Sequence, residues 1–117
     1  MRSDPSAQRP QDVLADRIRV LLSGLEVREV RMFGGIAFMV DGRMAVSAGR
    51  EGDLLVRVDP KQHTALLDTP GVRQPLMGDR SMGPGWLLVE GSHLNGEGVL
   101  ESWVDRSLES QAGPGTG

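Results

Sequence analysis

An Asp-Gly pair between two apolar runs is the feature that most constrains how this chain can fold. Asp41 and Gly42 separate an apolar run at residues 36–40 from a second run at residues 43–48. Asp and Gly both accept the positive φ angles that a type I′ turn requires. The pattern therefore predicts a β-hairpin with a two-residue loop.

The short loop also predicts which residues pair across the hairpin, because loop length sets the register. The expected pairs are Val40 with Arg43, Met39 with Met44, Phe38 with Ala45, and Ala37 with Val46. A turn at residues 49–52 would then place Ala45 beside Val56 and Val46 beside Leu55 in a third strand.

This register gives the sheet two apolar faces. One face collects Ile36, Phe38, Val40, Ala45, Leu54, Val56 and Val58, and the other collects Ala37, Met39, Met44, Val46 and Leu55, with Arg57 at the side. A sheet with one solvated face normally alternates apolar and polar residues. The second face is therefore covered by the short helix, the long loop or the N-terminal arm, or it binds a partner or a second copy. Methionines are common at adaptable binding surfaces, and the candidate partner surface is Met39, Met44, Val46 and Leu55.

Two amphipathic helices are expected to flank the sheet. Apolar residues at helical spacing predict one helix at residues 12–25 and another over residues 99–108, with Asn95 as a candidate N-cap. The apolar positions are Leu14, Ile18, Leu21, Leu22 and Leu25 in the first helix, and Val99, Leu100, Trp103, Val104 and Leu108 in the second.

Shorter elements complete the predicted domain. The other expected strands lie at residues 27–32, 53–58, 74–77 and 86–90. Asp59 and Pro60 favour the start of a short helix that runs to residue 67, because Asp can accept free amide hydrogen bonds and Pro fits the first helical position. Residues 1–11 are expected to form a flexible arm, residues 12–110 one domain, and residues 111–117 a disordered tail.

Charge and composition disfavour several classes of protein. The net charge of −3 would not attract phosphates over long range, and four aromatic residues leave few stacking platforms for single-stranded nucleic acid. The chain has no cysteine, no apolar signal core and no apolar run of membrane-spanning length. We therefore expect a cytoplasmic protein that does not enter a membrane.

No residue cluster predicts a reaction. The two histidines, His63 and His93, lack other ligands at metal spacing, and His63 is expected at the surface of the short helix. No nucleophile-elbow pattern surrounds Ser47, Ser81 or Ser92. We expect no enzyme activity, no metal and no cofactor.

Four arginines from neighbouring strands suggest a candidate basic patch. They are Arg28, Arg31, Arg43 and Arg57. Nucleic-acid binding through them would depend steeply on salt. Alternatively, they form a solvated sheet edge that pairs with Glu26 and Glu29.

A glycine pair precedes the hairpin. Gly34 and Gly35 could present amides to an anion, but phosphate loops lead into a helix and here a strand follows, which favours a tight turn or bulge. The surrounding motif is Arg31-Met32-Phe33-Gly34-Gly35.

Taken together, five features of the chain resemble the N-terminal domain of the TfoX/Sxy proteins, bacterial regulators of competence. They are this motif, the leading helix, the Asp-Gly hairpin, residues 53–58 and the helix bearing Trp103. The likeness covers about residues 12–108, without the C-terminal helical domain of the full-length regulators. It implies an α+β fold in two layers, with one antiparallel sheet of about five strands flanked by N- and C-terminal helices, like secretion-chaperone domains.

The resemblance implies a non-catalytic regulatory or adaptor domain that acts by protein–protein interaction or self-association. Two alternatives stay open. The first is nucleic-acid binding through the arginines near the hairpin. The second is a small-ligand-binding domain or enzyme with a pocket beside Phe33 and Trp86.

Overall fold

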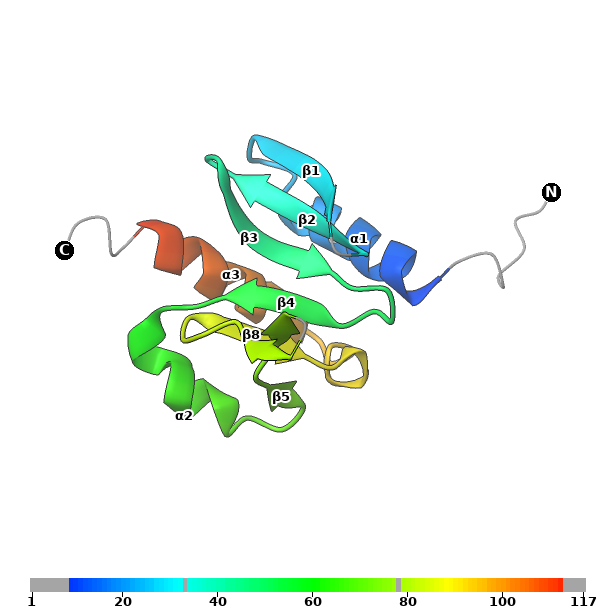
Figure 1. Cartoon of the computed structure of the whole chain (residues 1–117). Coiled ribbons are helices and arrows are strands. Elements are labelled where there is room, and N and C mark those ends of the chain that lie inside the picture. Colours follow the sequence, from blue (N-terminus) through cyan, green and yellow to red (C-terminus); the bar gives the residue numbers. More distant parts are fainter. Residues whose placement is uncertain (1–8, 33, 78, 113–117) are drawn as a thin grey trace.

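A six-stranded antiparallel sheet forms the centre of the protein, and two helices cover one of its faces (Figure 1). The computed structural model describes residues 9–32, 34–77 and 79–112. In spatial order the strands are β1 (Val27–Met32), β2 (Gly35–Val40), β3 (Arg43–Ala48), β4 (Leu54–Arg57), β8 (Trp86–Val89) and β5 (Val72–Arg73). The α+β prediction is confirmed, with six strands in the main sheet where about five were expected.

The helices and smaller elements lie around this sheet. They are α1 (Pro10–Leu21), a 3₁₀ turn (Pro60–Gln62) leading into α2 (His63–Leu67), a 3₁₀ turn (Gly91–His93), α3 (Val99–Ala112), and a separate ribbon of β6 (Leu76–Met77) and β7 (Arg80–Ser81). Within the described residues, no helix is long and apolar enough to cross a bilayer.

Helix α1 is shifted towards the N-terminus relative to the prediction. It begins at Pro10, where proline needs no hydrogen-bonded amide, so Pro10 and Gln11 belong to the helix and not to the expected arm. The side-chain Nε2 of Gln11 donates to the carbonyls of Gly34 and Ala48. The helix ends at Leu21, which leaves Leu25 46% exposed beyond the buried stripe. Residues 1–8, most of the expected arm, lie outside the described residues.

Helix α3 starts later than the proposed cap implied. Its first residue is Val99, and the Gly98 carbonyl accepts the hydrogen bond of the Ser102 amide. Gly98 has a φ of +79°, which turns the chain into the helix axis. Asn95 lies four residues before the helix, so the prediction that it is the N-cap was wrong. The helix includes residues 111 and 112, which were assigned to the tail, and residues 113–117 lie outside the described residues.

The Asp-Gly hairpin forms as predicted at its tip. Asp41 and Gly42 have φ angles of +54° and +81°, and Val40 pairs with Arg43. The pairing of Met39 with Met44 is also confirmed.

Beyond that pair the register shifts at a β-bulge. Phe38 pairs with Val46 instead of Ala45, so Ala45 is an extra residue in β3. The predicted pairings of Ala45 and Val46 with β2 and β4 were therefore wrong by one residue. Val46 pairs with Val56, and Ser47 pairs with Leu55.

The bulge moves Val46 to the helix-covered side of the sheet. Val46 is fully buried in the main core with Phe38, Val56 and Leu87. Ala45 also lies in that core, as predicted. Ser47 takes the position on the opposite face that was expected for Val46, because side chains alternate along a strand.

Two side chains bind the backbone carbonyls at the bulge. The Ser107 hydroxyl of α3 donates to the Ala45 carbonyl at 2.7 Å, and the Nε of Arg57 donates to the Met44 carbonyl at 3.3 Å. Ser107 is fully buried. A buried carbonyl without a partner is costly, so these bonds stabilise the irregular strand.

The substitution Ser107→Ala tests this arrangement. It should lower the free energy of unfolding by about 1–3 kcal/mol, because it leaves the buried Ala45 carbonyl without its donor. Urea denaturation measures the change. The matched control is Ser102→Ala, which removes an exposed hydroxyl bound to Val99 in the same helix and should cost less than about 0.5 kcal/mol. Equal losses in both variants would contradict a special role for Ser107.

Candidate interaction face

The helices leave one face of the sheet open. In Figure 1 the strands lie in front of α1 and α3, so the view is onto this face. We call it the open face and define it by its half-exposed apolar side chains. These are Val30, Met39, Met44, Leu55, Trp86 and Leu88.

Three of the four residues predicted as a partner surface lie on the open face. Met39, Met44 and Leu55 are half-exposed there. Val46 is not part of it, because the bulge turns its side chain into the core. Trp86 and Leu88 were not predicted as part of this surface. Alternation along residues 86–89 places the two side chains on one face together, and the pairing of Leu55 with Leu88 makes it the face of Leu55.

The long loop covers one end of the open face, as one of the alternatives proposed. The loop contains the β6–β7 ribbon. Pro75, directly before the ribbon, is buried, and Leu76 in β6 is 64% exposed. Helix α2 does not provide this cover, because Leu66 and Leu67 pack against the main core.

An apolar pocket of about 390 Å³ lies between the ribbon and the sheet. Pro75, Leu76 and Met82 line it from the loop, and Met44, Leu55 and Leu88 line it from the sheet. Its remaining described lining comes from Met32, Gly35, Ser47, Gly49 and Asp53. We refer to this space as the apolar pocket.

The glycine pair has a clear structural role. Gly34 has a φ of +78°, and a Cβ on Gly35 would lie 2.7 Å from the Ser47 hydroxyl oxygen and 3.2 Å from the Ala48 carbonyl oxygen. The predicted close approach is thus confirmed at Gly35. Gly35 starts a strand and not a helix, so the pair does not form a phosphate loop. Of the motif, Arg31 and Met32 end β1, and Phe33 lies outside the described residues.

The four arginines of the candidate basic patch do not converge. Arg28 is exposed on the open face, but Arg31 is three residues along the same strand and so points to the opposite face. Arg57 lies against Trp86, with its guanidinium carbon 4.6 Å from the ring centroid. Arg43 is at the far side of the Asp-Gly turn. The prediction of a single patch was wrong because strand alternation separates its members.

The expected pairing of these arginines with glutamates is also different. Glu29 is held by Arg19 of α1, at 2.7 and 2.8 Å. The Arg19 guanidinium therefore keeps the pKa of Glu29 below its usual range.

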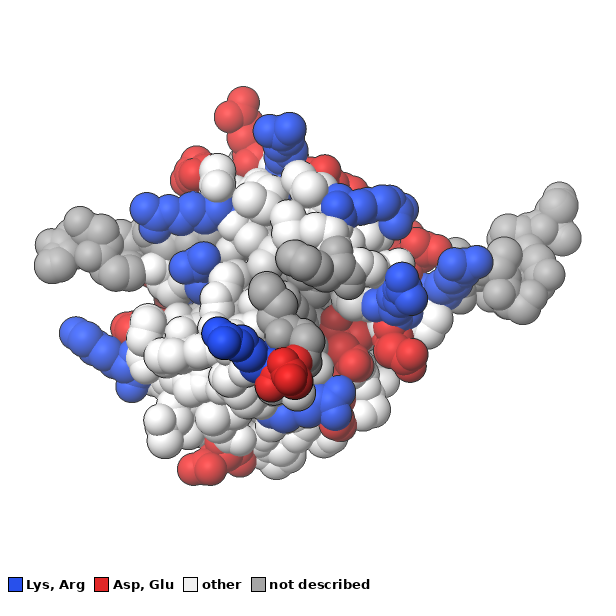
Figure 2. All heavy atoms as spheres, in the orientation of Figure 1, with Lys and Arg blue, Asp and Glu red and all other residues white. Residues whose placement is uncertain are grey.

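Figure 2 shows the charge distribution over the open face. Uncharged atoms make up much of the described surface in this view, and Lys or Arg side chains and several acidic groups lie among and around them. The chain has only one lysine, so these basic side chains are almost all arginines.

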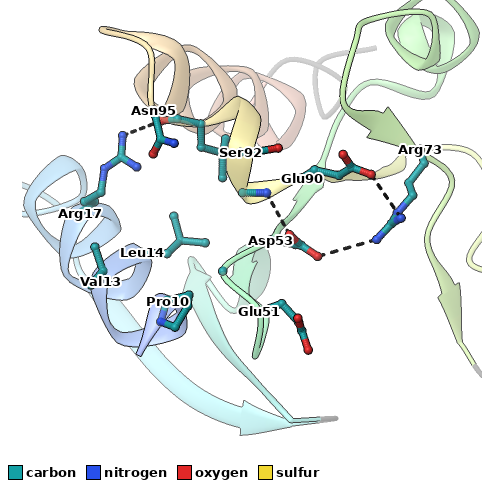
Figure 3. Close-up of a pocket in the computed structure, with 13 residues that line it drawn as sticks. Pro10, Val13, Leu14, Arg17, Glu51, Asp53, Arg73, Glu90, Ser92 and Asn95 are labelled. Carbon is teal, nitrogen blue, oxygen red and sulfur yellow. Dashed lines mark hydrogen bonds and ion pairs between the residues drawn. The ribbon is translucent and has the colours of Figure 1, made fainter. Parts of the chain in front are cut away.

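A second, polar hollow of about 590 Å³ lies where the N-terminal half of α1 meets the β3–β4 turn and residues 90–95 (Figure 3). Asp53 accepts from the Gly91 amide at 2.9 Å and lies 3.7 Å from Arg73. Arg73 also contacts Glu90, and Arg17 donates to the Leu94 carbonyl. These contacts join the segment at 90–95 to the sheet and to α1.

The histidines and serines do not form a catalytic arrangement in the described residues. His63 is buried, which corrects its expected surface position. Its Nδ1 accepts from the Gly85 amide at 3.0 Å, so its Nε2 carries the proton and donates to Gln74 at 2.7 Å. His93 and Ser92 are exposed, and the Ser81 hydroxyl accepts from the Gly83 amide. No group of three or more acidic or histidine side chains in residues 9–32, 34–77 and 79–112 could hold a metal.

A comparison with protein families matches residues 21–111 to the TfoX N-terminal domain. The chain belongs to this family. The matched range runs from the end of α1 through the sheet and into α3, so it contains the open face, the bulge and the apolar pocket. No curated protein and no solved structure matches the chain. At a coarse level, membership supports a regulatory, competence-related domain for this TfoX N-terminal domain.

Duplex DNA titrations at several salt concentrations test the separation of the arginines. If all four acted together on phosphates, the slope of log K against log salt would be about −3.6. We expect no measurable binding, or a slope shallower than about −2, because strand alternation places Arg28 and Arg31 on opposite faces. A slope near −3.6 that becomes shallower in the variant Arg28→Gln would contradict this expectation.

Proposed function

We propose that this TfoX N-terminal domain is a non-catalytic regulatory or adaptor domain, acting in the bacterial cytoplasm, that binds a protein partner through its open face. The observation that supports the proposal is a set of half-buried apolar side chains on one sheet face, spread over β1, β2, β3, β4 and β8. Its members Met39, Met44 and Leu55 are half-exposed although each lies in the middle of the sheet. Apolar side chains gathered on one sheet face in this way are typical of an interaction site.

The side chains on the open face also suggest the chemistry of the partner. Met39 and Met44 are neighbours across the hairpin and can repack around a range of apolar shapes. Arg28 pairs with Met39 across β1 and β2 and is exposed beside it. A partner segment with apolar side chains and an adjacent carboxylate fits this arrangement, because the carboxylate can pair with Arg28.

The arrangement of the histidines and serines supports the non-catalytic part of the proposal. His63, the buried histidine, uses both ring nitrogens in structural hydrogen bonds. Ser92 and His93 are neighbours in sequence and both are exposed, and within the described residues neither side chain bonds to a third group that would orient a base.

The substitution Met39→Glu tests the proposed surface. Tagged protein is used to capture partners from its own cells after nuclease treatment. A partner held by the wild-type chain should be lost from Met39→Glu, because the new carboxylate would place a charge in the apolar contact and compete with the partner's carboxylate for Arg28. The matched control is Val20→Glu, at a 71% exposed position of α1, which should retain the partner.

Other outcomes distinguish the alternatives. Loss of all captured material on nuclease treatment would favour nucleic-acid binding instead. If sedimentation shows a dimer that Met39→Glu alone dissociates, the partner is a second copy of the chain. If a folded Met39→Glu retains the same partner as Val20→Glu, the open face is not the binding surface.

A further inference from the structure

The apolar pocket contains a buried hydroxyl with no partner. Ser47 is 7% exposed and lines the pocket. Its side chain makes no hydrogen bond to any residue in the described parts of the chain. Buried polar groups are almost always hydrogen-bonded, so this hydroxyl requires a partner from outside the described structure.

The pocket also has unusually small residues at the point where Ser47 lies. Gly35 stands next to the hydroxyl, and a Cβ there would approach its oxygen to 2.7 Å. Any larger side chain at residue 35 would therefore fill the space that the hydroxyl faces. Gly35 keeps that space open.

The walls of the pocket favour an uncharged, mainly apolar occupant. Met44, Leu55 and Leu88 form the sheet side, and Leu76 and Met82 belong to the ribbon side. Asp53 is the one charged side chain in the described lining, and it already contacts the Gly91 amide and Arg73. A charged ligand would lose its hydration without gaining a free counter-charge.

We infer that the apolar pocket is a binding site for a small uncharged organic molecule with an apolar body and one hydrogen-bonding group, as in a phenol or an alcohol. The apolar body packs against the Met and Leu side chains, and the polar group bonds to the Ser47 hydroxyl. The volume of about 390 Å³ lies within the range of small-molecule sites. The pocket shares Met44, Leu55 and Leu88 with the open face, but this inference rests on the Ser47 hydroxyl and the pocket walls and not on a protein partner.

Phenol and benzene are suitable matched probes, because they differ only by the hydroxyl group. Titration of the full chain with each probe, followed by NMR of the methyl groups of Met44, Leu55 and Leu88, should give saturable shifts. The substitution Ser47→Ala should weaken phenol binding about fivefold relative to benzene, since only phenol loses a hydrogen bond. Because the Ser47 hydroxyl has no protein partner in the described residues, this variant should remain folded.

A blocking variant gives an independent readout. Leu88→Trp adds a ring to the pocket wall and should abolish binding of both probes, whereas Leu25→Trp, at an exposed position outside the pocket, should not. Met39→Glu should leave phenol binding unchanged even where it removes the protein partner.

Three results would overturn the inference. The first is the absence of saturable shifts for either probe, which would assign the Ser47 hydroxyl to ordered water. The second is an equal effect of Ser47→Ala on phenol and benzene. The third is a set of shifts centred on Met39 instead of Leu88. If Leu88→Trp fails to fold, the Ser47→Ala comparison still decides the question.

Discussion

The β-bulge at Ala45 is the feature on which both faces of the sheet depend. One extra residue in β3 reverses the direction of every side chain that follows it in the strand. Val46 and Ala48 therefore enter the main core, and Ser47 lies on the open face. Without the bulge, Ser47 would lie in the core and Val46 on the open face. The core gains an apolar side chain, and the open face gains a hydroxyl.

The bulge also connects the core to the open face through its hydrogen bonds. Ser107 reaches the Ala45 carbonyl from α3, and Arg57 reaches the Met44 carbonyl from β4. The same Arg57 side chain stacks on Trp86. Two neighbouring residues of β3, Met44 and Ala45, thus make the contacts that fix α3 against the sheet and that order the open face. Met44 belongs to both the open face and the apolar pocket. The hydrogen bond from Arg57 to the Met44 carbonyl therefore helps to hold both candidate surfaces in place.

The parts of the fold that follow from local rules could be predicted from the sequence. The bounds of β1, the Asp41-Gly42 turn and the first hairpin pairs depend on residues that are close in the chain. The bulge could not be predicted in this way, because one of its stabilising contacts comes from Ser107, 62 residues after Ala45. The wrong prediction that Val46 lies on the partner surface follows directly from the missed bulge. The burial of His63 has a similar origin, since Gly85 and Gln74 are its partners. By contrast, alternation alone could have separated Arg28 from Arg31.

Packing alone does not explain the residues at the floor of the apolar pocket. The main core on the other side of β3 is complete with Ala45, Val46 and Ala48. An apolar side chain at position 47 would cover the open face and avoid an unpaired buried hydroxyl, which normally costs stability. The absence of a side chain at Gly35 leaves the space beside this hydroxyl open. A small polar residue and a glycine at adjacent positions across two strands are unfavourable for packing but suitable for a ligand with one hydrogen-bonding group. The pocket is therefore better explained by binding than by stability.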